Sequence, residues 1–330
     1  MSLLDGCTNT MLTTTFGLWV FVFIASVYVL VRAAKYFTTA SEQIGKALHL
    51  PNFIVGTVIV AIGTSAPEAF TSLFGTVAGE SEFLAGTVIG TVMANTLLGL
   101  GLAVLLTRRV VRFDWDLIAN DLPLFLGAAV FLILMLLDGE FTTTEGIIML
   151  LGYGVYLFYV YTMRHGEEVE MKLHKRKKKH QPLKIRMIFT FCVSLLVLFV
   201  ASKFTVDAVI EIAHIIGIGT SLVAASALAV STSLPEIVVA VTAARRGNFD
   251  LALGDIVGSN IFDLFVIFGI GGMVTTLTVD DVAFRIGLPM LIGIILLLWL
   301  VLIDKKFTKA EAMLFVLAYL LFLGKLFGFI

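Results

Sequence analysis

Two acidic residues, Glu68 and Glu236, lie inside long apolar stretches and within nearly the same local sequence. Residues 63–95 and 231–263 align without a gap at a constant offset of 168. A shared Thr-Ser-x-Pro-Glu core with three glycines in register indicates an internal duplication. The matching residues are Thr64, Ser65, Pro67, Glu68, Gly79, Gly86 and Gly90 in the first copy, and Thr232, Ser233, Pro235, Glu236, Gly247, Gly254 and Gly258 in the second.

Both glutamates fall about halfway along their apolar stretches, where an ionisable side chain is costly and usually marks an ion path. Each is followed after the same interval by a second polar residue, Asn95 in the first copy and Asp263 in the second. One turn before this second pair, on the same faces, lie the hydroxyls of Thr91 and Ser259. Together these groups offer only hard oxygen ligands, which suit Ca²⁺, Na⁺ or Mg²⁺ rather than zinc or copper.

The prolines of the repeat add a second source of oxygen ligands. Pro67 and Pro235 each remove a backbone donor, and so break the hydrogen-bond ladder one turn earlier in the helix. In hydrocarbon the freed carbonyls must find partners, and a bound cation is one such partner. We expect these carbonyls near Ala61, Gly63 and Thr64 in the first copy, and near Ala229, Ser231 and Thr232 in the second.

The composition predicts that helices in a membrane position these groups. Of the 330 residues, 59% are hydrophobic and only 14% are charged, whereas a soluble domain carries roughly 25% charged residues. A spanning helix needs roughly 20 apolar residues. We therefore predict an all-α polytopic membrane protein with ten spans, at about 14–35, 52–78, 83–106, 117–137, 143–163, 186–203, 218–244, 251–276, 283–303 and 309–329.

The loops between these spans alternate in charge, and basic loops stay in the cytoplasm. This pattern predicts that both termini lie outside and that the basic loop 164–186 is cytoplasmic. That loop divides the chain into a five-helix half at 1–163, a connector at 164–185 and a second five-helix half at 186–330. Glu80 and Glu82 follow the second span and Arg245 and Arg246 the seventh, so the two copies of the repeat have opposite orientations. Inverted repeats are typical of secondary transporters, with the substrate site near the midplane.

The sequences GTSAPE…GTVMAN and STSLPE…GSNIFD resemble the two alpha repeats of the sodium/calcium exchanger family, within the cation/calcium antiporter superfamily. The resemblance is closest to compact prokaryotic members and covers about 61–95 and 229–263. It implies an antiporter that exchanges Na⁺ for Ca²⁺ by alternating access. It also implies location in a prokaryotic cell (inner) membrane, with the lipid bilayer and small cations as partners. We expect no cofactor, no nucleic acid and no obligate protein partner.

The resemblance also implies ligand sets. Ca²⁺ and Na⁺ would bind through Glu68, Glu236 and Asp263, which together with Asn95 form a central diamond of sites. One flanking Na⁺ site would comprise Ala61, Thr64, Ser65, Glu68 and Thr91, and the other Ala229, Thr232, Ser233, Glu236 and Ser259. The chain departs from the family pattern at Val92, where an asparagine is expected, and Asp263 is also found in the potassium-dependent branch.

Other functions remain open at this point. A Ca²⁺/H⁺ exchanger or a K⁺-dependent Na⁺/Ca²⁺ exchanger would use the same fold, and a channel can also contain inverted repeats with proline-broken helices. An intramembrane aspartyl protease is a remote alternative, because Asp255 lies in the sequence ALGD, which is close to the GxGD of such enzymes. Asp255 also shares a helix face with Ser259 and Asp263, so one interpretation is that it lines the cytoplasmic approach to the site. Its partner position in the repeat is Thr87, so we favour the second interpretation, a residue near a helix end.

Overall fold

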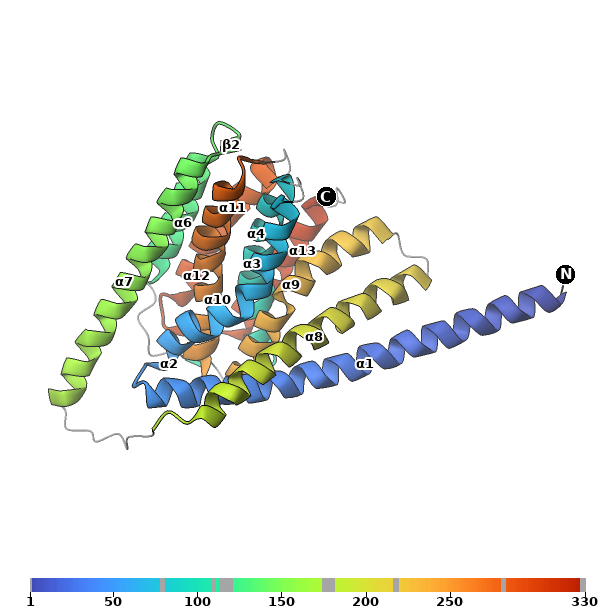
Figure 1. The fold of residues 1–330 in the computed structure, drawn as a ribbon, viewed down its shortest axis with the longest axis horizontal. Coiled ribbons are helices and arrows are strands. Elements are labelled where there is room, and N and C mark those ends of the chain that lie inside the picture. Colours follow the sequence, from blue (N-terminus) through green and yellow to red (C-terminus); the bar gives the residue numbers. More distant parts are fainter. Residues whose placement is uncertain are drawn as a thin grey trace.

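The computed structural model describes residues 2–77, 81–107, 111–112, 121–173, 182–215, 220–279 and 283–326, which form a helical bundle (Figure 1). Helical stretches within these ranges follow the ten predicted spans, and four of them contain a π-helical segment, labelled η. They are α1 (Ser2–Ala47); α2 (Asn52–Ile54), η1 (Val55–Val60) and α3 (Ala61–Val77); α4 (Ser81–Met93), η2 (Ala94–Gly99) and α5 (Leu100–Leu105); α6 (Asp121–Met135); α7 (Thr143–Leu173); α8 (Ile185–Ile215); α9 (Thr220–Arg245); α10 (Phe249–Phe262), η3 (Asp263–Ile267) and α11 (Phe268–Val274); η4 (Ala283–Gly287) and α12 (Leu288–Leu302); and α13 (Lys309–Leu326).

The length and composition of these helices fit a membrane protein. Among the described residues, six helical stretches are long and apolar enough to cross a bilayer, and two shorter apolar helices accompany them. The number of ten spans stays a prediction. Helix α7 continues beyond residue 163 to Leu173, into the segment predicted as a basic loop. The run Lys175 to Lys179 lies outside the described residues.

Two central stretches are enclosed by the others. Most side chains of the stretches from Phe249 to Val274 and from Leu84 to Leu105 are buried, although Met273 and Val274 at the end of the first are 51% and 44% exposed. Helix α10 packs against η1, α3, α6 and α9, and α5 packs against α9 and α13. Helices α1 and α8 pack along each other on one flank of the bundle, inclined to the central helices (Figure 1). Large apolar side chains cover their outer faces, as expected of surfaces that meet lipid.

The backbone repeats the duplication seen in the sequence. Segment η2 includes Asn95, and η3 begins at Asp263, which is the aligned position in the second copy. Single turns of π-helix within α-helices are rare and occur frequently at functional sites. The same rare distortion at the same repeat position indicates that both halves shape the backbone around this pair of residues in the same way.

Two short strand pairs join the halves. Strand β1 (Val111–Arg112) pairs antiparallel with β4 (Lys306–Phe307), and β2 (Glu140–Phe141) pairs antiparallel with β3 (Leu277–Thr278). Each pair takes one strand from each half, and each joins two loops that the charge pattern places on the same side of the membrane. The pairing therefore agrees with the predicted relative topology of these four loops.

A further sequence match, outside the aligned repeats, starts the last helix of each half. Thr142 follows β2 and Thr308 follows β4, and each is followed three residues later by a glutamate. Glu145 accepts hydrogen bonds from the backbone N–H (2.6 Å) and hydroxyl (2.8 Å) of Thr142. Glu311 accepts the same two bonds from Thr308, both at 2.7 Å. The threonine and glutamate thus satisfy polar groups at the start of α7 and α13.

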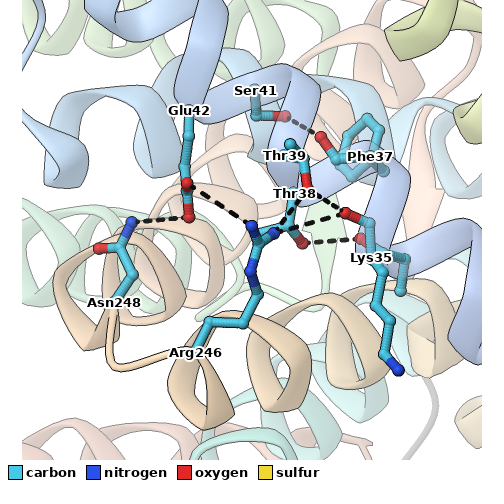
Figure 2. A network of polar contacts seen from close by, with 9 residues as sticks. Lys35, Phe37, Thr38, Thr39, Ser41, Glu42, Arg246 and Asn248 are labelled. Atoms are coloured by element: carbon cyan, nitrogen blue, oxygen red, sulfur yellow. Dashed lines mark hydrogen bonds and ion pairs between the residues drawn. The ribbon is translucent and has the colours of Figure 1, made fainter.

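Helix α1 is joined to the turn between α9 and α10 by a polar network at one end of the bundle (Figure 2). The guanidinium of Arg246 donates to the hydroxyl of Thr39 (2.8 Å) and the carbonyl of Lys35 (3.4 Å), and lies 3.9 Å from the carboxylate of Glu42. Asn248 donates to the other oxygen of Glu42 at 3.2 Å. Exposed ion pairs contribute about 0–1 kcal/mol, so this network orients α1 more than it stabilises the fold.

The backbones of η1 and α10 cross in close contact where glycines face each other. A Cβ added to Gly254 would lie 2.3 Å from the carbonyl oxygen of Phe53, and one added to Gly258 would lie 2.5 Å from that of Thr57. In the first half, a Cβ on Gly86, the repeat partner of Gly254, would meet no described atom within 4 Å. Among the described residues, the close approach is therefore present at Gly254 and not at Gly86, and Gly254 is required for packing there.

This difference predicts unequal effects of the same substitution at matched positions. Gly254→Ala places a methyl group against backbone and is expected to destabilise the protein by about 1–3 kcal/mol. Gly86→Ala is the control, and it is expected to leave stability unchanged or raise it by up to about 1 kcal/mol, because alanine favours a helix. Thermal unfolding of the purified protein in detergent measures both. Equal melting temperatures for the two variants would contradict the close crossing.

Candidate functional site

Four elements converge on the predicted site. Helix α3 carries the first Thr-Ser-x-Pro-Glu sequence and α9 the second, while α4 with η2 and α10 with η3 carry the polar pairs that follow. Helix α3 packs against α4, α9, α10 and η3, and α9 packs against α4, η2 and α10. The predicted site residues with described side chains are at most 2% exposed: Ala61, Thr64, Ser65, Glu68, Thr91, Asn95, Ser233, Glu236, Ser259 and Asp263.

Side chains from the two halves meet at the centre of the bundle. The hydroxyl of Ser65 in α3 donates to Oε1 of Glu236 in α9 at 3.5 Å. Within the first half, the hydroxyl of Thr91 donates to Oε1 of Glu68. The carboxylate of Asp263 interacts electrostatically with Glu68 and Glu236, and with the hydroxyl of Ser65. The structure therefore brings together the three acidic residues that the sequence predicts for one site.

Several of these buried polar atoms are not hydrogen-bonded to any described residue. They include both side-chain polar atoms of Asn95, both carboxylate oxygens of Asp263, Oε2 of Glu236 and Oγ of Ser259. Buried polar groups in proteins nearly always have a partner, so a cluster of such atoms is typical of a binding site. All but the amide nitrogen of Asn95 are hard oxygen donors, the type that Na⁺ and Ca²⁺ prefer.

The donor set is mixed and not a compact acidic cage. Within the described ranges, no three His, Cys, Asp or Glu side chains are close enough to form a metal centre by themselves. Hydroxyl and amide oxygens separate the carboxylates instead. A cation held here would take ligands of several types, as expected for an ion that must also leave.

The carbonyls expected to be freed at the prolines lie in continuous helices. Helix α3 continues through position 67 and α9 through Pro235, so neither helix is interrupted there. The hydroxyl of Thr64 has one proton, which is shared between the carbonyl oxygens of Val60 (3.1 Å) and Ala61 (3.3 Å) and is also within reach of Oδ1 of Asp255 (3.4 Å). The Ala61 carbonyl thus already has one partner, although a carbonyl oxygen has a second lone pair for a cation. The side chains of Pro67, Ala229 and Thr232 lie outside the described residues.

Three polar residues at the site were not assigned to it from the sequence. Asp255 is fully buried in the middle of α10, so its interpretation as a helix-end residue was wrong. Its Oδ1 accepts a hydrogen bond from Thr64 at 3.4 Å. Asn260 of α10 donates to the hydroxyl of Thr96 in η2 at 2.7 Å, and this bond joins the two halves. One sequence signal could have identified Asn260: it directly follows Ser259, which was assigned to the site.

Comparison with known proteins identifies relatives of both halves. Residues 18–162 and 186–328 match the family model described as sodium/calcium exchanger protein. Inner membrane protein YrbG of Escherichia coli (strain K12) is 28% identical over 266 residues, which cover 79% of this chain and 81% of that protein. Sodium/calcium exchanger MaX1 of Methanosarcina acetivorans is 28% identical over 334 residues, covering 89% of this chain and 95% of that protein.

A solved structure is similar over nearly the whole length. The sodium-calcium exchanger NCX_Mj, soaked with Na⁺ and Ca²⁺, superposes with a TM-score of 0.77 at 25% sequence identity. The alignment covers 92% of this chain and 97% of that chain. The resemblance inferred from the two short repeats is therefore confirmed over both halves.

The bond between the halves can be tested by a double-mutant cycle. Asn260→Ala and Thr96→Val each remove one partner of a buried hydrogen bond, so each should destabilise the protein, whereas the double variant should lose less than their sum. We expect a coupling of about 0.5–1.5 kcal/mol, measured from unfolding of the four proteins in detergent. Asn248→Ala, which alters a partly buried contact at the start of α10 in Figure 2, should show no coupling with Thr96→Val. Strictly additive effects of Asn260→Ala and Thr96→Val would contradict the bond.

Proposed function

Because this chain belongs to the sodium/calcium exchanger family, we propose that it exchanges Na⁺ for Ca²⁺ across a membrane through the buried oxygen cluster. The observation that carries this proposal is the contact of Ser65 with Glu236, which unites the repeats in one site. The function is secondary transport, in which the ion gradients supply the energy. Na⁺ and Ca²⁺ are substrates, and the proposal needs no cofactor and no partner protein.

The charges of the site account for exchange between the two ions. Glu68 and Glu236 balance one Ca²⁺ or two Na⁺, and an ionised Asp263 allows a third Na⁺. Several carboxylates close together cannot all stay ionised without cations. The site therefore favours the state with bound Ca²⁺ or the state with bound Na⁺ over an empty, fully ionised state. Asn95 and the hydroxyls of Thr91 and Ser259 supply neutral oxygens, which complete the coordination of an ion without adding charge.

Alternating access requires that the site open to one side at a time. The close crossing of η1 and α10 at Gly254 and Gly258 supports closure at the end of the bundle where α10 begins. The more open surroundings of Gly86 in the opposite half support access from the other end. We propose that α1 and α8, which pack mainly on each other, move relative to the central helices between the two states.

The orientation follows from the charges of the loops. We propose a prokaryotic cell (inner) membrane location, with both termini outside and the loop 164–186 in the cytoplasm. Strand β4 and its neighbouring lysines would then face the cytoplasm, and β2 would face the outside. The acidic residues Glu80, Asp280 and Asp281 of the outer loops lie outside the described residues.

Flux through reconstituted vesicles tests the exchange. We expect an outward Na⁺ gradient to drive ⁴⁵Ca²⁺ uptake, and a protonophore to leave this uptake intact because protons are not the coupling ion. Glu68→Gln and Glu236→Gln should reduce uptake to the level of protein-free vesicles, since each removes a charge that balances the cations. Glu140→Gln, which alters an exposed glutamate in β2, is the matched control and should transport normally.

The same assay distinguishes the other exchangers. Uptake that follows a proton gradient and ignores Na⁺ would replace the proposal with Ca²⁺/H⁺ exchange. Uptake that needs K⁺ on the Na⁺ side would indicate the K⁺-dependent reaction. Discrete single-channel currents in a planar bilayer would contradict the carrier mechanism altogether.

Cysteine labelling tests the orientation. In a variant with Cys7 and Cys192 replaced by serine, Glu140→Cys should react with a membrane-impermeant maleimide added to intact cells. Lys306→Cys in β4 should react only after the cells are permeabilised. The reverse pattern would show that the termini lie in the cytoplasm.

A further inference from the structure

Asp255 is a further buried carboxylate near Glu68, Glu236 and Asp263, and the ligand sets described above do not use it. It lies in α10 between the helix start at Phe249 and Asp263, and its side chain is 0% exposed. Eight residues of helix separate it from Asp263, which corresponds to about 12 Å along the axis. The ring of Phe249 packs against Phe307 of β4, with centroids 6.4 Å apart. Asp255 therefore lies between the central cluster and the end of the bundle that contains β4.

The surroundings of Asp255 connect it to the site. Its Oδ1 lies 3.4 Å from the hydroxyl of Thr64, whose one proton is shared with two backbone carbonyls, whereas its Oδ2 has no hydrogen-bond partner among the described residues. The carboxylate interacts electrostatically with Glu236, and the hydroxyl of Thr64 interacts with both acids. A Cβ added to Gly56 would lie 2.7 Å from the backbone nitrogen of Asp255, so η1 closes over this part of α10.

A carboxylate in this position requires either a proton or a cation. Burying an ionised carboxylate is unfavourable unless a charge or several hydrogen bonds compensate it, and the single bond from Thr64 at 3.4 Å is long. The equivalent position in the first half is Thr87, which has no charge. The fold shared by the two repeats therefore does not require an acidic residue at this position, and Asp255 is specific to the second half.

We propose that Asp255 is a cation ligand which, with the hydroxyl of Thr64 and the nearby Glu236, forms a further position for a hard cation. This position lies between the central cluster and the β4 end, so an ion leaving or reaching the cluster on that side would occupy it. The inference rests on the proposed exchange function. Carboxylate and hydroxyl oxygens accept Na⁺, K⁺ and Ca²⁺ alike, so the experiment uses each ion in turn.

The test compares Asp255→Asn with wild-type protein in vesicles. Asparagine has nearly the shape of a protonated aspartate but cannot be ionised. The variant therefore distinguishes two roles of Asp255, a charged cation ligand and a side chain that always stays neutral. We expect the concentration of at least one of Na⁺, K⁺ or Ca²⁺ that gives half-maximal ⁴⁵Ca²⁺ exchange to rise by about tenfold or more, since even supporting residues change metal affinity by roughly 10–100-fold. Thr87→Val, at the matched repeat position, should leave all three curves unchanged.

The outcomes separate this inference from the function on which it rests. Wild-type vesicles without Na⁺-driven uptake would refute the proposed function. Wild-type uptake together with unchanged curves for Asp255→Asn would refute the ligand role and show that Asp255 is a neutral packing group. If Asp255→Asn does not fold, Asp255→Glu carries the comparison: a retained charge on a longer side chain should change the half-maximal concentrations selectively among the three ions. Identical shifts for all three ions, or none, would refute the proposal.

Discussion

Negative charge buried at the centre of an apolar helical bundle is the constraint on which this structure depends. Glu68, Glu236, Asp255 and Asp263 are all at most 2% exposed. Helices enclose them because only helices satisfy their own backbone groups in lipid. The hydroxyls and amide between the acids then decide where cations can bind, and the bound cations in turn compensate the buried charge.

The sequence predicted the large features because their signals are strong and periodic. The apolar stretches predicted where helices lie, and the repeat around Glu68 and Glu236 predicted that two distant segments meet. The features that the sequence could not predict depend on packing between helices. Burial of Asp255 follows from the crossing of α10 with η1, and the bond from Asn260 to Thr96 follows from the approach of η2. The π-helical segments at Asn95 and Asp263 have no recognisable local sequence signal.

The two halves share a framework but differ where function would require a direction. Both contain a π-helical segment and a Thr-x-x-Glu helix start at corresponding places, and each contributes one strand to each of the two strand pairs. They differ at Gly254, where an added Cβ would meet backbone, and at Gly86, where it would meet no described atom within 4 Å. They also differ in side chains at aligned positions of the repeat: Asp255 is aligned with Thr87, and Asp263 with Asn95. A perfectly symmetric protein would have equal access from both sides, so packing and charge differences of this kind give the two sides distinct properties.

The strand pairs also affect how the protein is assembled. Residues 111–112 and 140–141 are synthesised in the first half, but they pair with residues 306–307 and 277–278 near the end of the chain. At roughly 5–20 residues per second, translation needs on the order of ten seconds or more to deliver those partners. During that interval the first half waits in the membrane with Glu68 lacking the opposing half-site. Both strand pairs, and the contact of Ser65 with Glu236, therefore form only after much of the second half has been synthesised.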